Sequence, residues 1–147
     1  EQRLSPLATA VSLLLQHPQL AEEVALPERL TFGSETADTG NRLLSEVHTI
    51  ASEHPDTSSA ALVERFRDHD NFRTLEKLAT RNHLLEAAAV TSFYRETIDT
   101  IEQQAVSSAI TELLRRSTET GLDSADKVQL ATLYNRREIL RAGRESA

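Results

Sequence analysis

Apolar residues recur at three- and four-residue intervals along the first half of the chain, the spacing that places side chains on one face of an α-helix. The first such run follows Ser5 and Pro6, which are suited to the cap and the first position of a helix. We expect this helix to end near His17, because the residue before Pro18 avoids helical geometry. Its apolar positions are Leu7, Ala10, Val11, Leu14 and Leu15.

Four more short helices are predicted between Pro18 and residue 82, separated by proline or small polar residues. Residues 31–41, rich in Gly, Ser, Thr and Asp, form the one long loop candidate. Residues 56–58 supply caps for the fourth helix, and residues 68–71 form a polar break before the fifth. The apolar positions of these helices are Leu20 and Val24; Leu43, Leu44, Val47 and Ile50; Leu62, Val63 and Phe66; and Phe72, Leu75 and Leu78.

A different pattern follows, since residues 84–120 contain neither glycine nor proline. A continuous apolar stripe of this length predicts one helix longer than most globular helices. Gly121 suits a helix C-cap, and Asp123 can cap a last helix over residues 124–141. The two helices, joined by so short a turn, are expected to form an antiparallel hairpin.

The predicted fold is therefore all-α: a compact bundle of short helices, then a long helix and a C-terminal antiparallel helical hairpin. We expect a helical-bundle subdomain over residues 1–83, a connecting helix over 84–104 and the hairpin over 105–147. Only four glycines and four prolines occur in 147 residues, too few for a turn-rich β fold. The chain begins at Glu1 without methionine, which we interpret as a piece of a longer protein.

Charge and cysteine content narrow the function classes. A net charge of −7 disfavours general binding to nucleic acid, so no direct nucleic-acid partner is expected. The absence of cysteine removes disulfides and thiolate zinc sites and fits a cytoplasmic origin. The longest apolar run, residues 11–15, is much shorter than the ~20 residues of a membrane span.

No catalytic or metal-binding pattern stands out. The five histidines do not pair at the spacing of a helical zinc site, and the common phosphate-binding and nucleophile motifs are missing. Asp68, His69 and Asp70 could be ligands, but a polar turn with a helix cap explains them as well. We predict no catalytic residue, metal or cofactor in this chain.

Two features suggest protein docking instead. Arg73, Lys77 and Arg81 recur every four residues on one predicted helix face and could hold an anionic peptide, although a solvated face balanced by Glu76 is the alternative. The last helix combines apolar residues with arginines, as interface hot spots do. Those apolar residues could instead all face the preceding helix. The residues concerned are Leu130, Leu133, Tyr134, Arg136, Arg137, Ile139 and Leu140.

Three segments carry a family resemblance. The opening RLSPLATAVSLLLQHPQLAEEV contains an LL-x-Q-x-P-x-L-A element, LEKLA follows at residues 75–79, and TGLDSADKVQLATLYNRREIL ends the chain with a Gly-Leu turn. In this order and spacing they resemble the C-terminal, helicase-binding domain of bacterial DNA primase. The resemblance spans nearly the whole chain.

The resemblance implies a non-catalytic docking domain of a DNA-directed RNA polymerase, whose zinc and magnesium sites would lie outside this chain. The hairpin would bind the N-terminal domain of the replicative helicase and bring primer synthesis to the bacterial replication fork. The implied helicase contacts are Leu130, Leu133, Tyr134, Asn135, Arg136, Arg137, Ile139 and Leu140.

A second implied partner is the acidic C-terminal tail of single-stranded-DNA-binding protein, held by the bundle. An anionic tail with apolar residues needs cations beside an apolar groove. The implied contacts are Arg3, Leu7 and Val11, with the basic stripe of Arg73, Lys77 and Arg81. The rival hypotheses are a structural or oligomerisation domain, which would form a stable dimer alone, and a small helical enzyme, which would need converging carboxylates or histidines.

Overall fold

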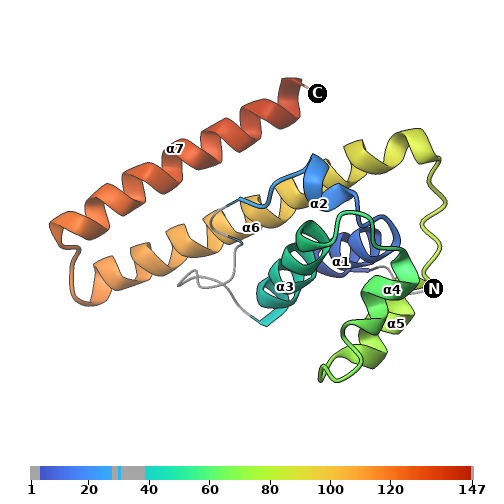
Figure 1. The fold of residues 1–147 in the computed structure, drawn as a ribbon. Coiled ribbons are helices and arrows are strands. Elements are labelled where there is room, and N and C mark those ends of the chain that lie inside the picture. The colour runs from blue at the N-terminus through green and yellow to red at the C-terminus, as the bar shows by residue number, and fades with distance from the viewer. Residues whose placement is uncertain (1–3, 28–29, 31–38, 147) are drawn as a thin grey trace. The chain divides into compact units, whose positions relative to one another are not determined.

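The computed structural model describes residues 4–27, residue 30 and residues 39–146, with no side-chain description for 39–40 and 144–146. Within these ranges the chain forms α-helices, short 3₁₀ segments that include η2, and no β-strand, which confirms the all-α prediction. The elements are α1 (Pro6–Gln16), α2 (Leu20–Glu23), α3 (Thr39–Glu53), α4 (Ser59–Glu64), α5 (Phe72–Ala79), η2 (Ala87–Ala89), α6 (Val90–Glu119) and α7 (Ser124–Ser146). Figure 1 shows their order along the chain.

The chain divides into two compact units, residues 1–98 and residues 99–147. The division falls inside α6, which continues unbroken across it. No helix of the described residues is both long and apolar enough to span a bilayer.

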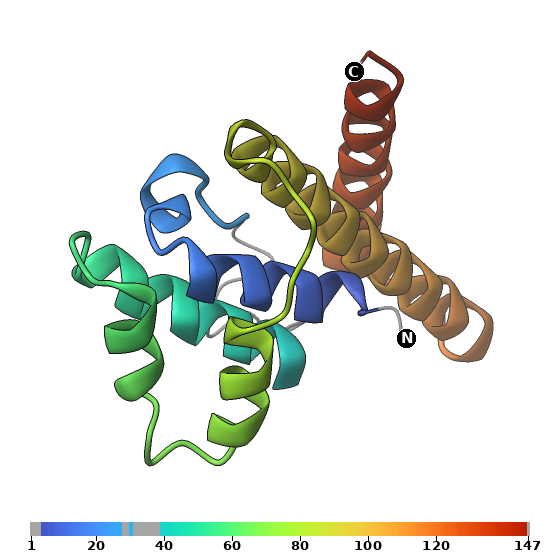
Figure 2. The ribbon, with the colours of Figure 1, turned by 90° about the vertical axis from the view of Figure 1, so that its right-hand side faces the viewer.

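Helix α1 is central to the first unit, where it packs against α3, α4 and α5 (Figure 2). Its start follows the sequence prediction, since the Ser5 hydroxyl accepts a hydrogen bond from the amide of Ala8 at 3.1 Å. The buried apolar side chains of this unit come from each of its α-helices, whereas η2 contributes none. They include Ala10, Val11, Leu13, Leu14, Leu15, Leu20, Leu44, Val47, Leu62, Leu75, Val90 and Tyr94.

A buried polar network fastens α1 to the end of α5 and the segment after it. The Ser12 hydroxyl donates to the carbonyl oxygen of Leu78 at 2.5 Å and therefore accepts from Nε2 of His83 at 2.6 Å. The side-chain amide of Gln16 donates to the carbonyl oxygens of Leu78 at 3.1 Å and Arg81 at 2.7 Å. These bonds satisfy the carbonyls left free where α5 ends.

The predicted start of the long helix near residue 84 was wrong, because α6 begins at Val90. Leu84 has a backbone φ of 56°, which a continuing helix cannot accommodate. The side-chain oxygen of Asn82 accepts a hydrogen bond from the Leu84 amide at 2.8 Å and stabilises this turn. The helix therefore starts only after this connection.

The second unit is the predicted antiparallel helical hairpin, made of the second half of α6 and α7 (Figure 1). Gly121 makes the turn with φ 76°, and the Asp123 carboxylate caps α7 by accepting from the Asp126 amide at 2.7 Å. The last helix extends to Ser146, beyond the predicted end at residue 141. The hairpin core consists of Val106, Ile110, Leu113, Leu133 and Leu140, with Ala109, Leu122 and Leu130 packed against it.

Candidate functional site

Helix α7 of the hairpin has an inner and an outer face, and both carry apolar side chains. On the inner face, Leu133 is fully buried and Leu140 is 7% exposed. The structure thus places these two predicted docking residues in the hairpin core, where they face α6. While the hairpin stays closed, Leu133 and Leu140 support the outer face of α7 from inside and are not part of it.

The outer face presents Val128, which is 67% exposed, Asn135, and Ile139, which is 51% exposed. Intervals of seven and four residues bring these three side chains onto one line. Val128 and Ile139 are separated by roughly 16 Å along the helix, at 1.5 Å per residue. We call this line (Val128, Asn135 and Ile139) the outer stripe.

Tyr134 lies on a flank of α7, roughly 100–140° around the helix from the members of the outer stripe at about 100° per residue, and is 36% exposed. The guanidinium carbon of Arg137 lies 4.9 Å from the centre of the Tyr134 ring, within the range of a cation–π contact. The pair presents an aromatic ring whose position is restrained before any partner binds. Rings of this kind often anchor protein interfaces.

Arg136, another predicted docking residue, is engaged within the hairpin. Its Nε and Nη2 donate to the Glu102 carboxylate at 2.7 and 2.6 Å, a bidentate pair between α7 and α6. The Glu102 side chain is 5% exposed and that of Arg136 is 40% exposed. Hydrogen bonding to Glu102 raises the pKa of Arg136. Its main role in the structure is to lock α7 against α6.

Other charged groups of the hairpin also pair internally. Arg115 contacts Glu112 and Glu119, and Arg116 lies 3.5 Å from Asp126 across the turn. The surface left for a partner is therefore more apolar than the arginine count of the sequence suggests. Its large apolar members are Leu114, Val128, Tyr134 and Ile139.

The basic stripe on α5 belongs to the first unit. Arg73 and Lys77 are exposed, whereas Arg81 lies beyond the helix end and is partly buried. Because α5 packs against α1, the half-buried Leu7 comes from the helix beside these cations. Val11 is only 2% exposed and offers little surface, and Arg3 lies outside the described residues.

Sequence reasoning missed Glu102 and left Val128 out of the site. Glu102 is the one charged residue among the buried polar residues of the described chain. Its signal in the sequence is a position one turn after the apolar Ile98. Val128 was recognised as apolar, but its outward direction depends on the rotation of α7 about its axis. Among the described residues, no group of three or more His, Cys, Asp or Glu side chains could hold a metal ion.

Comparisons with known proteins agree on one family. A family model described as DNA primase DnaG DnaB-binding matches residues 7–133. The DNA primase of Pasteurella multocida is 25% identical over 134 residues, which cover 91% of this chain and 22% of that protein. The DNA primase of Pseudomonas putida is 28% identical over 131 residues, covering 89% and 19%. The chain thus spans about a fifth of the length of these relatives.

Among solved structures, the chain is similar to the DnaG primase C-terminal domain from Vibrio cholerae. The TM-score is 0.74 at 25% sequence identity, with 95% of this chain and 97% of that chain covered. The family-model match ends at Leu133, so Tyr134, Asn135 and Ile139 lie beyond the matched segment.

Proposed function

This chain belongs to the DnaB-binding family of DNA primase DnaG, and we propose that it is the domain through which a bacterial primase docks on the replicative helicase. The hairpin carries the contact, and the helicase presents its N-terminal domain. Docking brings primer synthesis, which other parts of the primase perform, to the replication fork. In this proposal the chain contributes binding and no catalytic group.

The observation that carries the proposal is the clustering of exposed apolar side chains on the hairpin. Of the five large apolar residues that are exposed in the described chain, four belong to α6 and α7 of this unit: Leu114, Val128, Tyr134 and Ile139. Apolar side chains along one helix face, as Val128 and Ile139 are on α7, suit a groove between helices of a partner. Burial of these groups would provide most of the affinity.

The hairpin core and the Glu102–Arg136 pair support this face indirectly. They fix the rotation of α7 and so determine which of its side chains point outward. A surface that is ordered before binding loses less conformational entropy when a partner docks. Leu133, Leu140 and Arg136 therefore contribute to docking by positioning Val128, Tyr134 and Ile139.

A second proposed contact is the acidic C-terminal tail of single-stranded-DNA-binding protein. The exposed Arg73 and Lys77 on α5 supply positive charge, and the partly exposed Leu7 on the adjacent α1 supplies apolar surface. A peptide that combines carboxylates with apolar residues matches both. A synthetic peptide of that tail should bind the wild-type chain and lose affinity on Lys77→Glu. Equal affinity for both chains would reject this contact.

The docking proposal is tested by calorimetric titration of the full chain with the N-terminal domain of the same organism's replicative helicase, at low and moderate salt. We expect saturable binding that weakens little with salt, because apolar burial is insensitive to screening. Heat changes no larger than those of dilution would contradict it. Light scattering on the chain alone tests the rival: a stable dimer would favour an oligomerisation domain.

A further inference from the structure

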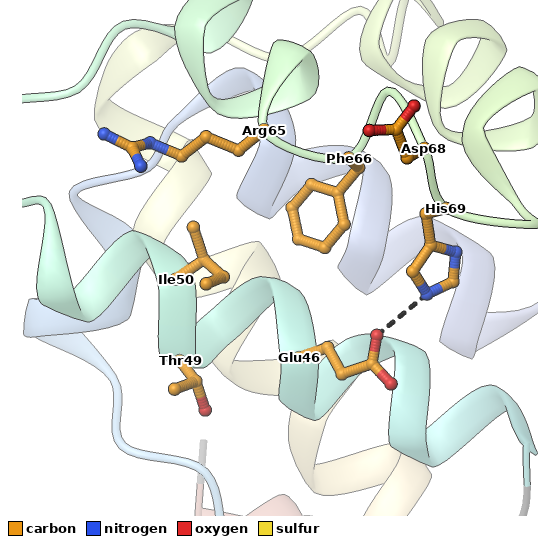
Figure 3. A pocket seen from close by; sticks show the side chains of 7 residues that line it. All are labelled: Glu46, Thr49, Ile50, Arg65, Phe66, Asp68 and His69. Carbon is orange, nitrogen blue, oxygen red and sulfur yellow. Dashed lines mark hydrogen bonds and ion pairs between the residues drawn. The ribbon is translucent and has the colours of Figure 1, made fainter.

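A cavity of about 500 Å³ lies between α3 and the turn that joins α4 to α5. Its volume falls within the range of ligand-binding pockets in proteins. All of its lining residues belong to the first unit, whereas the proposed helicase contact belongs to the second. The lining residues are Glu46, Thr49, Ile50, Arg65, Phe66, Asp68 and His69 (Figure 3).

The centre of the cavity is apolar. The half-buried Ile50 of α3 faces the ring of Phe66, which is 6% exposed. The His69 ring packs edge-on against Phe66 at a centroid distance of 5.8 Å and holds that ring in place. An apolar side chain entering here would contact surfaces that are already ordered.

One end of the cavity is negatively charged. Nε2 of His69 lies 2.9 Å from Oε2 of Glu46, and Nδ1 of His69 accepts a hydrogen bond from the Asn71 amide at 3.0 Å. Because Nδ1 accepts that hydrogen bond, Nε2 is the ring nitrogen that donates to the Glu46 carboxylate. The side chains of Glu46 and the exposed Asp68 thus place two carboxyl groups at this end.

The opposite end is positively charged. Figure 3 shows Arg65 extending away from Asp68, with Phe66 and Ile50 between the two charged ends. Within the described residues, the Arg65 side chain forms no ion pair, and the Glu46 carboxylate is hydrogen-bonded to His69. The neighbouring Arg67 is instead paired with Glu64. The cavity thus has an apolar floor between the carboxyl groups of Glu46 and Asp68 at one end and the guanidinium of Arg65 at the other.

We propose that this cavity is a second docking site, for a helical segment of a partner protein that presents one bulky apolar side chain between a basic and an acidic residue, each about one turn away. The apolar side chain fills the space between Ile50 and Phe66. The basic residue pairs with Glu46 and Asp68, and the acidic residue pairs with Arg65. A helix places residues at i, i+4 and i+8 along one face, which matches this linear order of charge, apolar surface and charge.

The test uses the full chain and a blocked, alanine-rich helical peptide with Lys, Leu and Glu at successive four-residue intervals. Binding is followed by NMR through the methyl groups of Ile50 and the ring of Phe66. We expect saturable shifts of both at submillimolar peptide. A peptide with alanine in place of the leucine should bind at least about tenfold more weakly, because it loses most of its apolar burial.

A charge reversal at Arg65 tests the proposed order of charged residues along the bound peptide. Arg65→Glu should weaken binding of the Lys-Leu-Glu peptide about fivefold, as expected for an exposed ion pair. The variant should also bind a Lys-Leu-Lys peptide more tightly than the Lys-Leu-Glu peptide. The matched control is Arg95→Glu, because Arg95 is also an exposed arginine but lies on α6 and does not line the cavity. This change should leave both affinities unchanged.

Three results would overturn the proposal. The shifts of Ile50 and Phe66 could fail to saturate at millimolar peptide, or Arg65→Glu could leave peptide preference unchanged. The same signals could instead shift with protein concentration alone as a dimer forms, which would assign the cavity to a second copy of the chain. None of these results bears on the helicase titration, which depends on the hairpin, so failure of one proposal is distinguishable from failure of the other.

Discussion

Replacing Ile139 by aspartate places a carboxylate in the outer stripe of α7 without entering the hairpin core. Ile139 is 51% exposed and points away from α6, so the folded hairpin should tolerate the change. A charge at Leu133 would be a poor test, because that side chain is fully buried and its replacement would open the hairpin itself. Loss of binding by Ile139→Asp can therefore be attributed to the docking surface.

The magnitude follows from the exposed fraction. Burying a whole isoleucine side chain contributes roughly 1.5–3 kcal/mol, and only the exposed half of Ile139 remains for a partner to cover. The lost apolar contact is then worth about 1 kcal/mol. Forcing a carboxylate into an apolar contact adds a desolvation cost of at least about 1 kcal/mol. The sum exceeds ~1.4 kcal/mol, so the affinity should fall at least about tenfold.

The assay is calorimetric titration with the helicase N-terminal domain, preceded by circular dichroism to confirm unchanged helicity and thermal midpoint. Leu84→Asp is the matched control, because Leu84 is an equally apolar residue, 87% exposed, in the first unit. It should bind the helicase as the wild-type chain does. An Ile139→Asp protein that stays folded and binds within about twofold of wild type would refute the outer stripe as the contact.

Three further predictions concern stability and are measured by urea unfolding followed by circular dichroism. Arg136→Met should destabilise the hairpin by about 2 kcal/mol, because it leaves the nearly buried Glu102 carboxylate without its partner. Replacing both Glu102 and Arg136 by methionine should recover most of the lost stability. An Arg136→Met protein as stable as wild type would contradict the role of this pair in locking α7 against α6. Tyr94→Phe should be neutral or stabilising by up to about 1 kcal/mol, because the Tyr94 hydroxyl is buried without a hydrogen-bond partner among the described residues. A loss of more than about 1 kcal/mol of folding stability would instead indicate a hydrogen bond to this hydroxyl. Burial, reinforced by nearby charge, lowers the pKa of His83 below its ordinary 6.5. The contribution of His83 to the folding stability should therefore be complete above pH 6.5 and diminish as the pH falls toward the folded-state pKa. His83→Gln should remove this pH dependence, and an unchanged slope would assign it to another group.

The local signals in the sequence predicted most of the secondary structure. Ser5 and Ser58 cap α1 and α4 as expected, and Gly121 makes the hairpin turn with a positive φ. Each of these depends on residues within a few positions of each other, so it can be recognised without knowing the fold. The start of α6 was missed because Leu84 adopts a positive φ, a conformation that the residue type does not indicate.

The docking surface was only partly predictable, because α7 is apolar on both faces. Periodicity groups Leu133 with Leu140 and Val128 with Ile139, but it does not say which group faces α6. That depends on tertiary packing against the core and on the pair between Glu102 and Arg136, whose partners lie 34 residues apart. The sequence therefore pointed to α7 for the proposed contact, and the structure was needed to identify which side of α7 is exposed.

The most direct test of the docking proposal is site-specific photo-crosslinking of the full chain in the presence of the helicase. A benzoylphenylalanine at position 139, or at position 128, should form a covalent adduct with the helicase N-terminal domain, because both side chains point outward from α7. The same probe at position 84, which is exposed in the first unit, serves as the reference. Adducts from positions 139 and 128 but not from 84 are the predicted result. Adducts from position 84 alone would contradict docking through the hairpin.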